Sequence, residues 1–102
     1  MDINAVVNNS KKRVLLLFTA TWCQPCKQLK KTLAHLLDNN PGIKKNILIN
    51  ELDIEEQSSQ HLLIKHKITS VPTLILLDEQ DKVIAIKTGN LQKLQLEQFL
   101  IQ

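Results

Sequence analysis

The apolar residues of this chain fall into short blocks, and the spacing within each block predicts a strand or a helix. Residues 14–18 (VLLLF) are continuously apolar, which is typical of a strand buried on both faces of a sheet. Residues 23–38 predict an amphipathic helix that is ended by the sequence NNPG at residues 39–42. The apolar positions of this helix recur at helical spacing: Cys26, Leu29, Leu33, Leu36 and Leu37.

The second half of the chain continues the alternation. Residues 46–54 (NILINELDI) predict a strand, and residues 56–66 predict a helix of about three turns. Residues 73–77 and 82–86 predict two strands, which the polar sequence DEQD joins as an antiparallel hairpin. We expect a last helix capped by Asn90. Its apolar stripe comprises Leu91, Leu94, Leu96, Phe99 and Leu100.

These blocks give the order βαβαββα, with a short helix at residues 3–9 as an additional first element. A helix joins the first two strands, so these strands are expected to be parallel, whereas the hairpin strands are antiparallel. The predicted fold class is therefore α/β, with a central four-stranded mixed sheet and helices on both faces. The length of 102 residues indicates that residues 1–102 form one domain.

Composition and charge exclude several classes of function. Apolar residues make up 43% of the chain, so a core can form without a disulfide to stabilise it. The net charge of +3 comes from scattered lysines with only two Phe and one Trp, which argues against nucleic-acid binding. No apolar run reaches the roughly 18 residues that a membrane helix needs. The run VLLLF is also short for a signal peptide, so we infer no export signal.

The sequence FTATWCQPCK places two cysteines where a strand ends and a helix begins. The N–H groups of a first helical turn favour an anion, so Cys23 is expected to ionise more readily than a free thiol. Pro25 suits that turn because its missing N–H would have had no partner there. Cys26 shares the buried face of the helix and should resist ionisation. Cys23 would then attack a disulfide, and Cys26 would resolve the mixed disulfide that results.

Two other interpretations of the cysteine pair were weighed. A zinc site needs four ligands, and His61 and His66 lie too far along the chain from Cys26 for a zinc-finger spacing. His66 is also on the apolar side of its predicted helix, where packing explains it better. The cysteines could instead be inert buried thiols. We expect no metal.

A proline directly precedes the apolar strand in SVPTLILL, residues 70–77. Proline is the residue that most readily takes a cis peptide bond. A cis bond before Pro72 would turn the backbone of Val71 outward, where it could pair with an extended peptide. Combined with a Cys-x-Pro-Cys motif about 50 residues earlier, this proline is a strong functional signal.

From about Arg13 onward, the chain resembles the thioredoxin family. The segment FTATWCQPCK is similar to the family's active-site segment, SVPTLILLDEQDKVI to its cis-proline hairpin, and TGNLQKLQLEQFL to its last glycine and helix. The resemblance implies that Trp22 shields the cysteine pair, and that Val71, Pro72 and Gly89 line a substrate groove. Gly89 is also explained by a simple turn.

The chain departs from the family pattern at positions that affect the chemistry. Gln24 replaces the usual glycine between the cysteines, where side chains tune the redox potential. Leu17 stands in place of a buried acid that helps to deprotonate the resolving thiol. Glu51 lies near the position of the lysine that partners this acid, and we hypothesise that Glu51 or a water accepts the proton. A solvated glutamate is the simpler explanation.

The sequence as a whole predicts a thiol–disulfide oxidoreductase that reduces protein disulfides through a redox-active Cys23–Cys26 disulfide. We expect no bound cofactor, an external electron donor such as a thioredoxin reductase, no membrane partner, a monomer and a cytoplasmic location. Two alternatives stay open. One is a periplasmic or membrane-linked thiol–disulfide interchange domain, and the other is a redox-inactive module that binds one partner beside Pro72.

Overall fold

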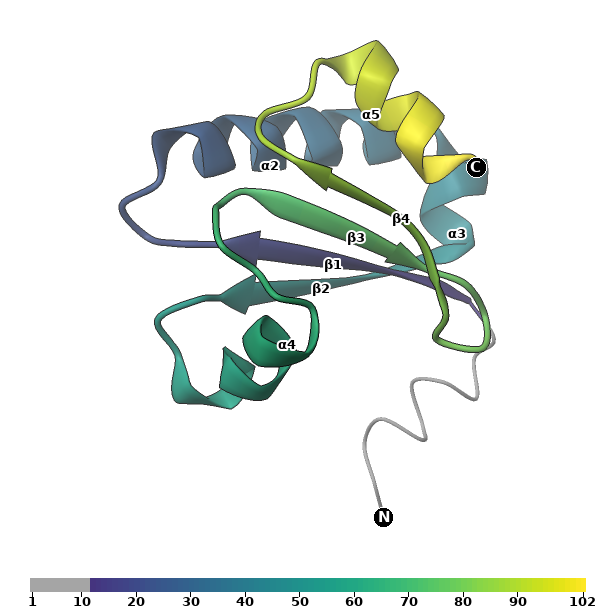
Figure 1. Ribbon diagram of the computed structural model, residues 1–102. Helices are drawn as coiled ribbons and strands as arrows, with labels where there is room; N and C mark the ends of the chain where they lie inside the picture. Colours follow the sequence, from purple (N-terminus) through teal and green to yellow (C-terminus); the bar gives the residue numbers. More distant parts are fainter. Residues whose placement is uncertain (1–11) are drawn as a thin grey trace.

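The fold is built around one central strand, β1. The computed structural model describes residues 12–102, so the helix predicted at residues 3–9 lies outside the described residues. Within this part, four strands form one sheet in the order β2-β1-β3-β4, as Figure 1 shows. The strands are β1 (Arg13–Thr19), β2 (Ile47–Asp53), β3 (Thr73–Leu77) and β4 (Val83–Thr88).

The pairing of the strands matches the prediction from their connections. β1 runs parallel to β2 and antiparallel to β3, and β3 pairs antiparallel with β4. The predicted mixed sheet is thus confirmed. β1 is enclosed by a neighbour on each side and by helices on each face, which explains why its sequence is continuously apolar.

The helices cover both faces of the sheet (Figure 1). α2 (Gln24–Asp38), α3 (Pro41–Lys45) and α5 (Lys93–Leu100) lie on one face, and α4 (Gln60–Lys65) lies on the other. None of the helices in residues 12–102 combines the length and the apolar character needed to cross a membrane.

Alternate residues of β1 supply two separate hydrophobic cores. Leu15 and Leu17 point into the core beneath α2 and α5, where Leu29 is fully buried. Leu16 and Phe18 point into the smaller core on the α4 side. This period of two is the expected alternation of side chains along a strand. It determines toward which face of the sheet each later residue of β1 points.

The sequence NNPG ends α2 as predicted, but it also starts a helix that the pattern did not reveal. Pro41 occupies the first turn of α3, where its fixed φ and missing N–H favour a helix start. The helix predicted at residues 56–66 is shorter than expected. Its first turn is a 3₁₀ turn, η1 (Gln57–Ser59), and no side chain caps α4.

Two details predicted for the last helix are wrong. Its N-cap is Gln92 and not Asn90, because the Gln92 and Gln95 side chains form a reciprocal capping box with the backbone. Leu94 is 63% exposed and does not belong to the apolar stripe. Leu96 and Phe99 face the core, and Leu94 is two positions before Leu96, so the helical turn directs it to the opposite side.

The contrast between Leu29 and Leu94 gives a direct test of this packing. We expect Leu29→Ala to lower the free energy of unfolding by about 2–5 kcal/mol, because it leaves a cavity beneath α2. Leu94→Ala, its exposed counterpart, should change it by less than about 0.5 kcal/mol. Urea unfolding followed by circular dichroism measures both values. Equal losses in the two variants would contradict the assignment of the core.

Candidate active site

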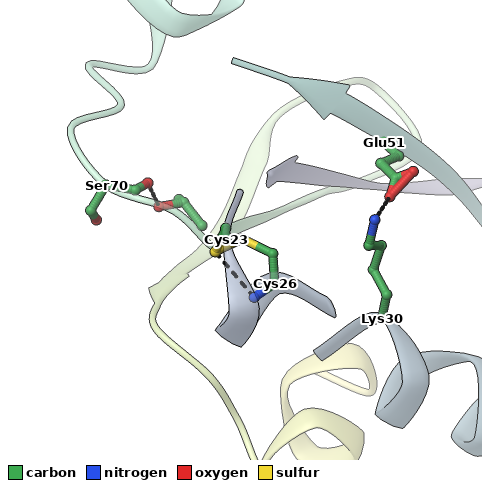
Figure 2. The surroundings of a disulfide bond; sticks show 6 residues. Cys23, Cys26, Lys30, Glu51 and Ser70 are labelled. Carbon is green, nitrogen blue, oxygen red and sulfur yellow. Dashed lines mark hydrogen bonds and ion pairs between the residues drawn. A yellow bond between two sulfur atoms is a disulfide. The ribbon is translucent and has the colours of Figure 1, made fainter. Parts of the chain in front are cut away.

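The two cysteines lie where β1 leads into α2. Cys23 is the N-cap of α2, with extended backbone, and Pro25 lies in the first turn. The Cys23 Sγ accepts a hydrogen bond from the backbone N–H of Cys26 at 3.1 Å. Figure 2 shows this contact and the disulfide that joins the two sulfurs, across a Cα–Cα distance of 5.3 Å. An N-cap side chain that takes up a free helical N–H is the arrangement that favours negative charge on sulfur.

The sulfurs are set into an apolar surface. Cys26 is fully buried and Cys23 is 4% exposed, and both belong to a small buried cluster with Ala20. Ile54 and Val71 pack against this cluster from the loops after β2 and before β3. Burial of the sulfur disfavours a thiolate. The hydrogen bond at the helix N-terminus acts in the opposite direction and favours a thiolate on Cys23.

The loop before β3 and the end of β4 meet beside the cysteines. The peptide bond between Val71 and Pro72 is cis. Thr73 Oγ1 donates a hydrogen bond to the Ser70 carbonyl at 2.8 Å (Figure 2). The Gly89 N–H donates to the Pro72 carbonyl at 2.9 Å. These bonds bring residues 70–73 and 89 to the same end of the sheet as Cys23.

Gly89 needs glycine for its backbone conformation. Its φ is +87°, in the left-handed region that other residues rarely adopt, although a Cβ there would meet no neighbouring atom. The turn interpretation of Gly89 is therefore sufficient to explain the residue, and its place beside Pro72 is compatible with a groove as well.

Trp22 extends from the active-site loop into solvent. Its side chain is 65% exposed. It borders a cavity of about 210 Å³ together with Ile54, Leu63, Ile68 and Val71. An exposed indole next to an apolar hollow is the kind of surface that favours contact with another molecule.

Glu51 lies on β2 opposite Leu17 of β1 in the parallel register. Its carboxylate forms an ion pair with the Lys30 Nζ of α2 at 3.0 Å, and both side chains are close to half exposed. Figure 2 shows the Glu51 side chain directed toward Lys30 and away from the disulfide. Leu17 itself is 2% exposed and packs in the larger core.

A cavity of about 190 Å³ lies between this ion pair and the active-site loop. Ala20 lines it and also belongs to the cysteine cluster, so the cavity and the sulfurs share a wall. The other lining residues are Thr19, Thr21, Lys30, Glu51, Asp53 and Glu56. Sequence reasoning missed this cavity, although the register that places Asp53 beside Thr19 could have indicated it.

Thr19 has an unusual position in this cavity. It is 5% exposed, and its hydroxyl oxygen is buried without a hydrogen-bond partner among residues 12–102. A buried hydroxyl normally has a partner, because leaving it unpaired costs free energy.

His66 packs as a partly buried ring at the end of α4. Its ring lies 6.4 Å from that of Phe18, centroid to centroid. Burial first, and then the charge of Lys65, lower the pKa of His66 below its ordinary value. No cluster of three or more potential metal-ligating side chains occurs in the part of the chain that the structure describes.

The fold and the cysteine pair together define the class: an α/β protein with a dithiol–disulfide centre at a strand–helix junction. The family model described as Thioredoxin matches residues 2–102. The thioredoxin of Haemophilus influenzae is 35% identical over 101 residues, covering 99% of this chain and 89% of that protein. The thioredoxin of Buchnera aphidicola is 35% identical over 94 residues, covering 92% and 82%. The chain belongs to the thioredoxin family.

Solved structures agree on the fold. The germline thioredoxin Deadhead of Drosophila melanogaster superposes with a TM-score of 0.79 at 23% identity, covering 97% of this chain and 88% of that one. Thioredoxin-2 of the malaria parasite gives 0.73 at 26% identity, with coverage of 88% and 82%. The protein is a thiol–disulfide oxidoreductase of the thioredoxin fold, with Cys23 and Cys26 as its redox-active pair.

Two buried threonines test whether the Thr19 hydroxyl lacks a partner. Thr19→Val should raise the free energy of unfolding by about 1 kcal/mol, because it removes an unpaired hydroxyl at constant shape. Thr73→Val should lower it by about 1 kcal/mol, because the Thr73 hydroxyl bonds the Ser70 carbonyl. Urea unfolding measures both. A loss of stability in Thr19→Val would contradict the unpaired assignment.

Proposed function

We propose that the protein reduces disulfides of other proteins, with Cys23 as the nucleophile and Cys26 as the resolving thiol. The observation that carries this proposal is the Cys26 N–H donated to the Cys23 Sγ at the N-terminus of α2. That hydrogen bond stabilises a thiolate on Cys23. The Cys26 sulfur accepts no hydrogen bond from residues 12–102; Cys26 is fully buried and lies on the core side of the helix.

The reaction transfers two electrons in two exchanges. The Cys23 thiolate attacks one sulfur of the substrate disulfide, forms a mixed disulfide and releases the other substrate sulfur as a thiolate. Cys26 then loses its proton and attacks the Cys23 Sγ, which closes the Cys23–Cys26 disulfide and releases the second substrate thiolate. Both released thiolates take up protons. A flavoprotein reductase or another thiol system must then supply two electrons to reopen the disulfide.

The binding surface proposed for the substrate is formed by Trp22, Val71, Pro72 and Gly89. Trp22 and Val71 border the apolar cavity, and Gly89 bonds to the Pro72 carbonyl. An extended segment of substrate could lie across these residues and present its disulfide to Cys23. Gln24 and Pro25 lie in the first turn of α2, from which they tune the stability of the thiolate.

The roles of the cysteines are tested by single substitutions. We expect Cys23→Ser to abolish the reduction of insulin, because no nucleophile remains. Cys26→Ser should retain attack but accumulate the mixed disulfide, which non-reducing electrophoresis detects. Reduction that survives in Cys23→Ser would overturn the assignment. Tight binding of a partner without turnover in the native protein would favour a redox-inactive binding module.

We propose that Glu51 accepts the proton of Cys26 through water. Leu17 provides no acid beneath the cysteines, whereas Glu51 lines a cavity that shares Ala20 with them. The Glu51 carboxylate is directed toward Lys30, so the transfer requires a water between this carboxylate and the Cys26 thiol. Proton transfer through one water is an accepted geometry for a general base.

Glu51→Gln tests this role. It should slow the release of product from the mixed disulfide by about tenfold or more, without slowing the first attack by Cys23. Lys30→Met is the matched control, since it breaks the same ion pair but keeps the carboxylate, and it should retain most of the rate. Single-turnover kinetics with a fluorescent disulfide peptide separates the two steps. An unchanged second step in Glu51→Gln would discard Glu51 as the acceptor.

We further propose that the protein works as a reductant in the cytoplasm and as a monomer. Whether the protein acts as a reductant depends on its redox potential, which equilibration with glutathione buffers measures. A potential more negative than about −240 mV supports reduction in a cytosol, whereas a less negative value favours an oxidising or periplasmic role. Size-exclusion chromatography with light scattering tests the monomer.

A further inference from the structure

The cavity next to the active-site loop has the charge of a binding site for a cation. Three carboxylates and one ammonium line it, which leaves a net charge of −2 at neutral pH. The Lys30 ammonium is paired with Glu51, so Asp53 and Glu56 remain. Neither of these two carboxylates forms an ion pair with another of residues 12–102.

A second and independent observation distinguishes this cavity from an ordinary acidic surface. Thr19 lines the cavity, and its hydroxyl is buried without a hydrogen-bond partner among residues 12–102. A hydroxyl oxygen accepts hydrogen bonds, and the carboxylates of Asp53 and Glu56 accept them as well. One oxygen of Asp53 already accepts the Glu55 N–H at 2.9 Å. Its other oxygen and the Glu56 carboxylate have no donor among residues 12–102, so the group that would complete the cavity is a positively charged hydrogen-bond donor.

The place of the cavity indicates where such a donor would come from. The loop from Thr19 to Cys23 connects the cavity with the reactive sulfur, and Ala20 contributes to both. A protein held on Cys23 as a mixed disulfide would be bonded to the last residue of this segment. One of its side chains is then the nearest source of a charged donor.

We propose that the cavity formed by Thr19, Asp53 and Glu56 binds an arginine side chain of the protein whose disulfide is being reduced. A guanidinium is planar and carries five N–H donors, so it can bond two carboxylates and a hydroxyl together. A lysine ammonium is more compact and more strongly hydrated, and it fits a set of spread acceptors less well. The subsite rests on the proposed disulfide reduction. It would make the protein prefer substrates that carry an arginine near the reactive disulfide.

Paired peptides provide the test. Each is a disulfide-bonded peptide with arginine or glutamine at one site, and this site is moved residue by residue along both sides of the reactive cysteine. At one or more positions, the native protein should reduce the arginine peptide with a kcat/KM about fivefold above that of its glutamine partner. In Asp53→Asn/Glu56→Gln, this ratio should fall toward one.

Three further variants keep the test decisive. Glu79→Gln/Asp81→Asn removes the same two charges from the β3–β4 turn, outside the cavity, and should keep the ratio of the native protein. Thr19→Val should lower the ratio, and Thr19→Ser should preserve it. These two variants test the subsite if the double variant does not fold.

The outcomes separate the subsite from the general reaction. A native protein that reduces both peptides equally at every position overturns the subsite and leaves disulfide reduction intact. A preference that survives in Asp53→Asn/Glu56→Gln, or that disappears equally in Glu79→Gln/Asp81→Asn, also overturns it. A native protein that reduces neither peptide removes the proposed function and the subsite together.

Discussion

The proposed function of this protein depends on one interaction, the hydrogen bond from the Cys26 N–H to the Cys23 Sγ at the N-terminus of α2. The surroundings of the sulfur are otherwise apolar, because Ala20, Ile54 and Val71 pack around it. Without the helix terminus, burial would favour the protonated thiol and leave a weak nucleophile. The helix in turn is held by the core beneath it, where Leu29 and Leu36 are fully buried against β1 and β3. Reactivity at the surface therefore depends on packing below it.

Backbone hydrogen bonds hold the other parts of the site against this helix. The Ile54 N–H donates to the Thr19 carbonyl, and the Gly89 N–H donates to the Pro72 carbonyl. The ends of β1, β2 and β4 thereby meet the start of β3 at one end of the sheet. Loops at such an edge can vary in sequence while the strands fix their position. Gln24 lies at this end of the sheet, in the first turn of α2, so it can differ from the family pattern within an unchanged fold.

Much of this arrangement could be predicted from local patterns. The apolar run of β1 and the spacing of Leu29 and Leu33 identified the central strand and helix, and these placed Cys23 at their junction. The errors arose where a longer-range or competing interaction decides. Asn90 is a good capping residue, but the reciprocal bonds of Gln92 and Gln95 start α5 later. The cavity around Thr19 depends on the register that sets Thr19 beside Asp53, which are far apart in the sequence.

Leu17 places an apolar side chain where the family resemblance implies a buried acid, so the nearest charged groups act on the cysteines from elsewhere. Leu17 adds apolar contact to the core, while the charged groups lie on the neighbouring strand and helix as Glu51 and Lys30. Because both side chains are close to half exposed, their ion pair adds at most about 1 kcal/mol to stability. The contribution of this ion pair to the stability of the fold is therefore small. The pair also places two charges in the wall of the adjacent cavity, which shares Ala20 with the cysteines.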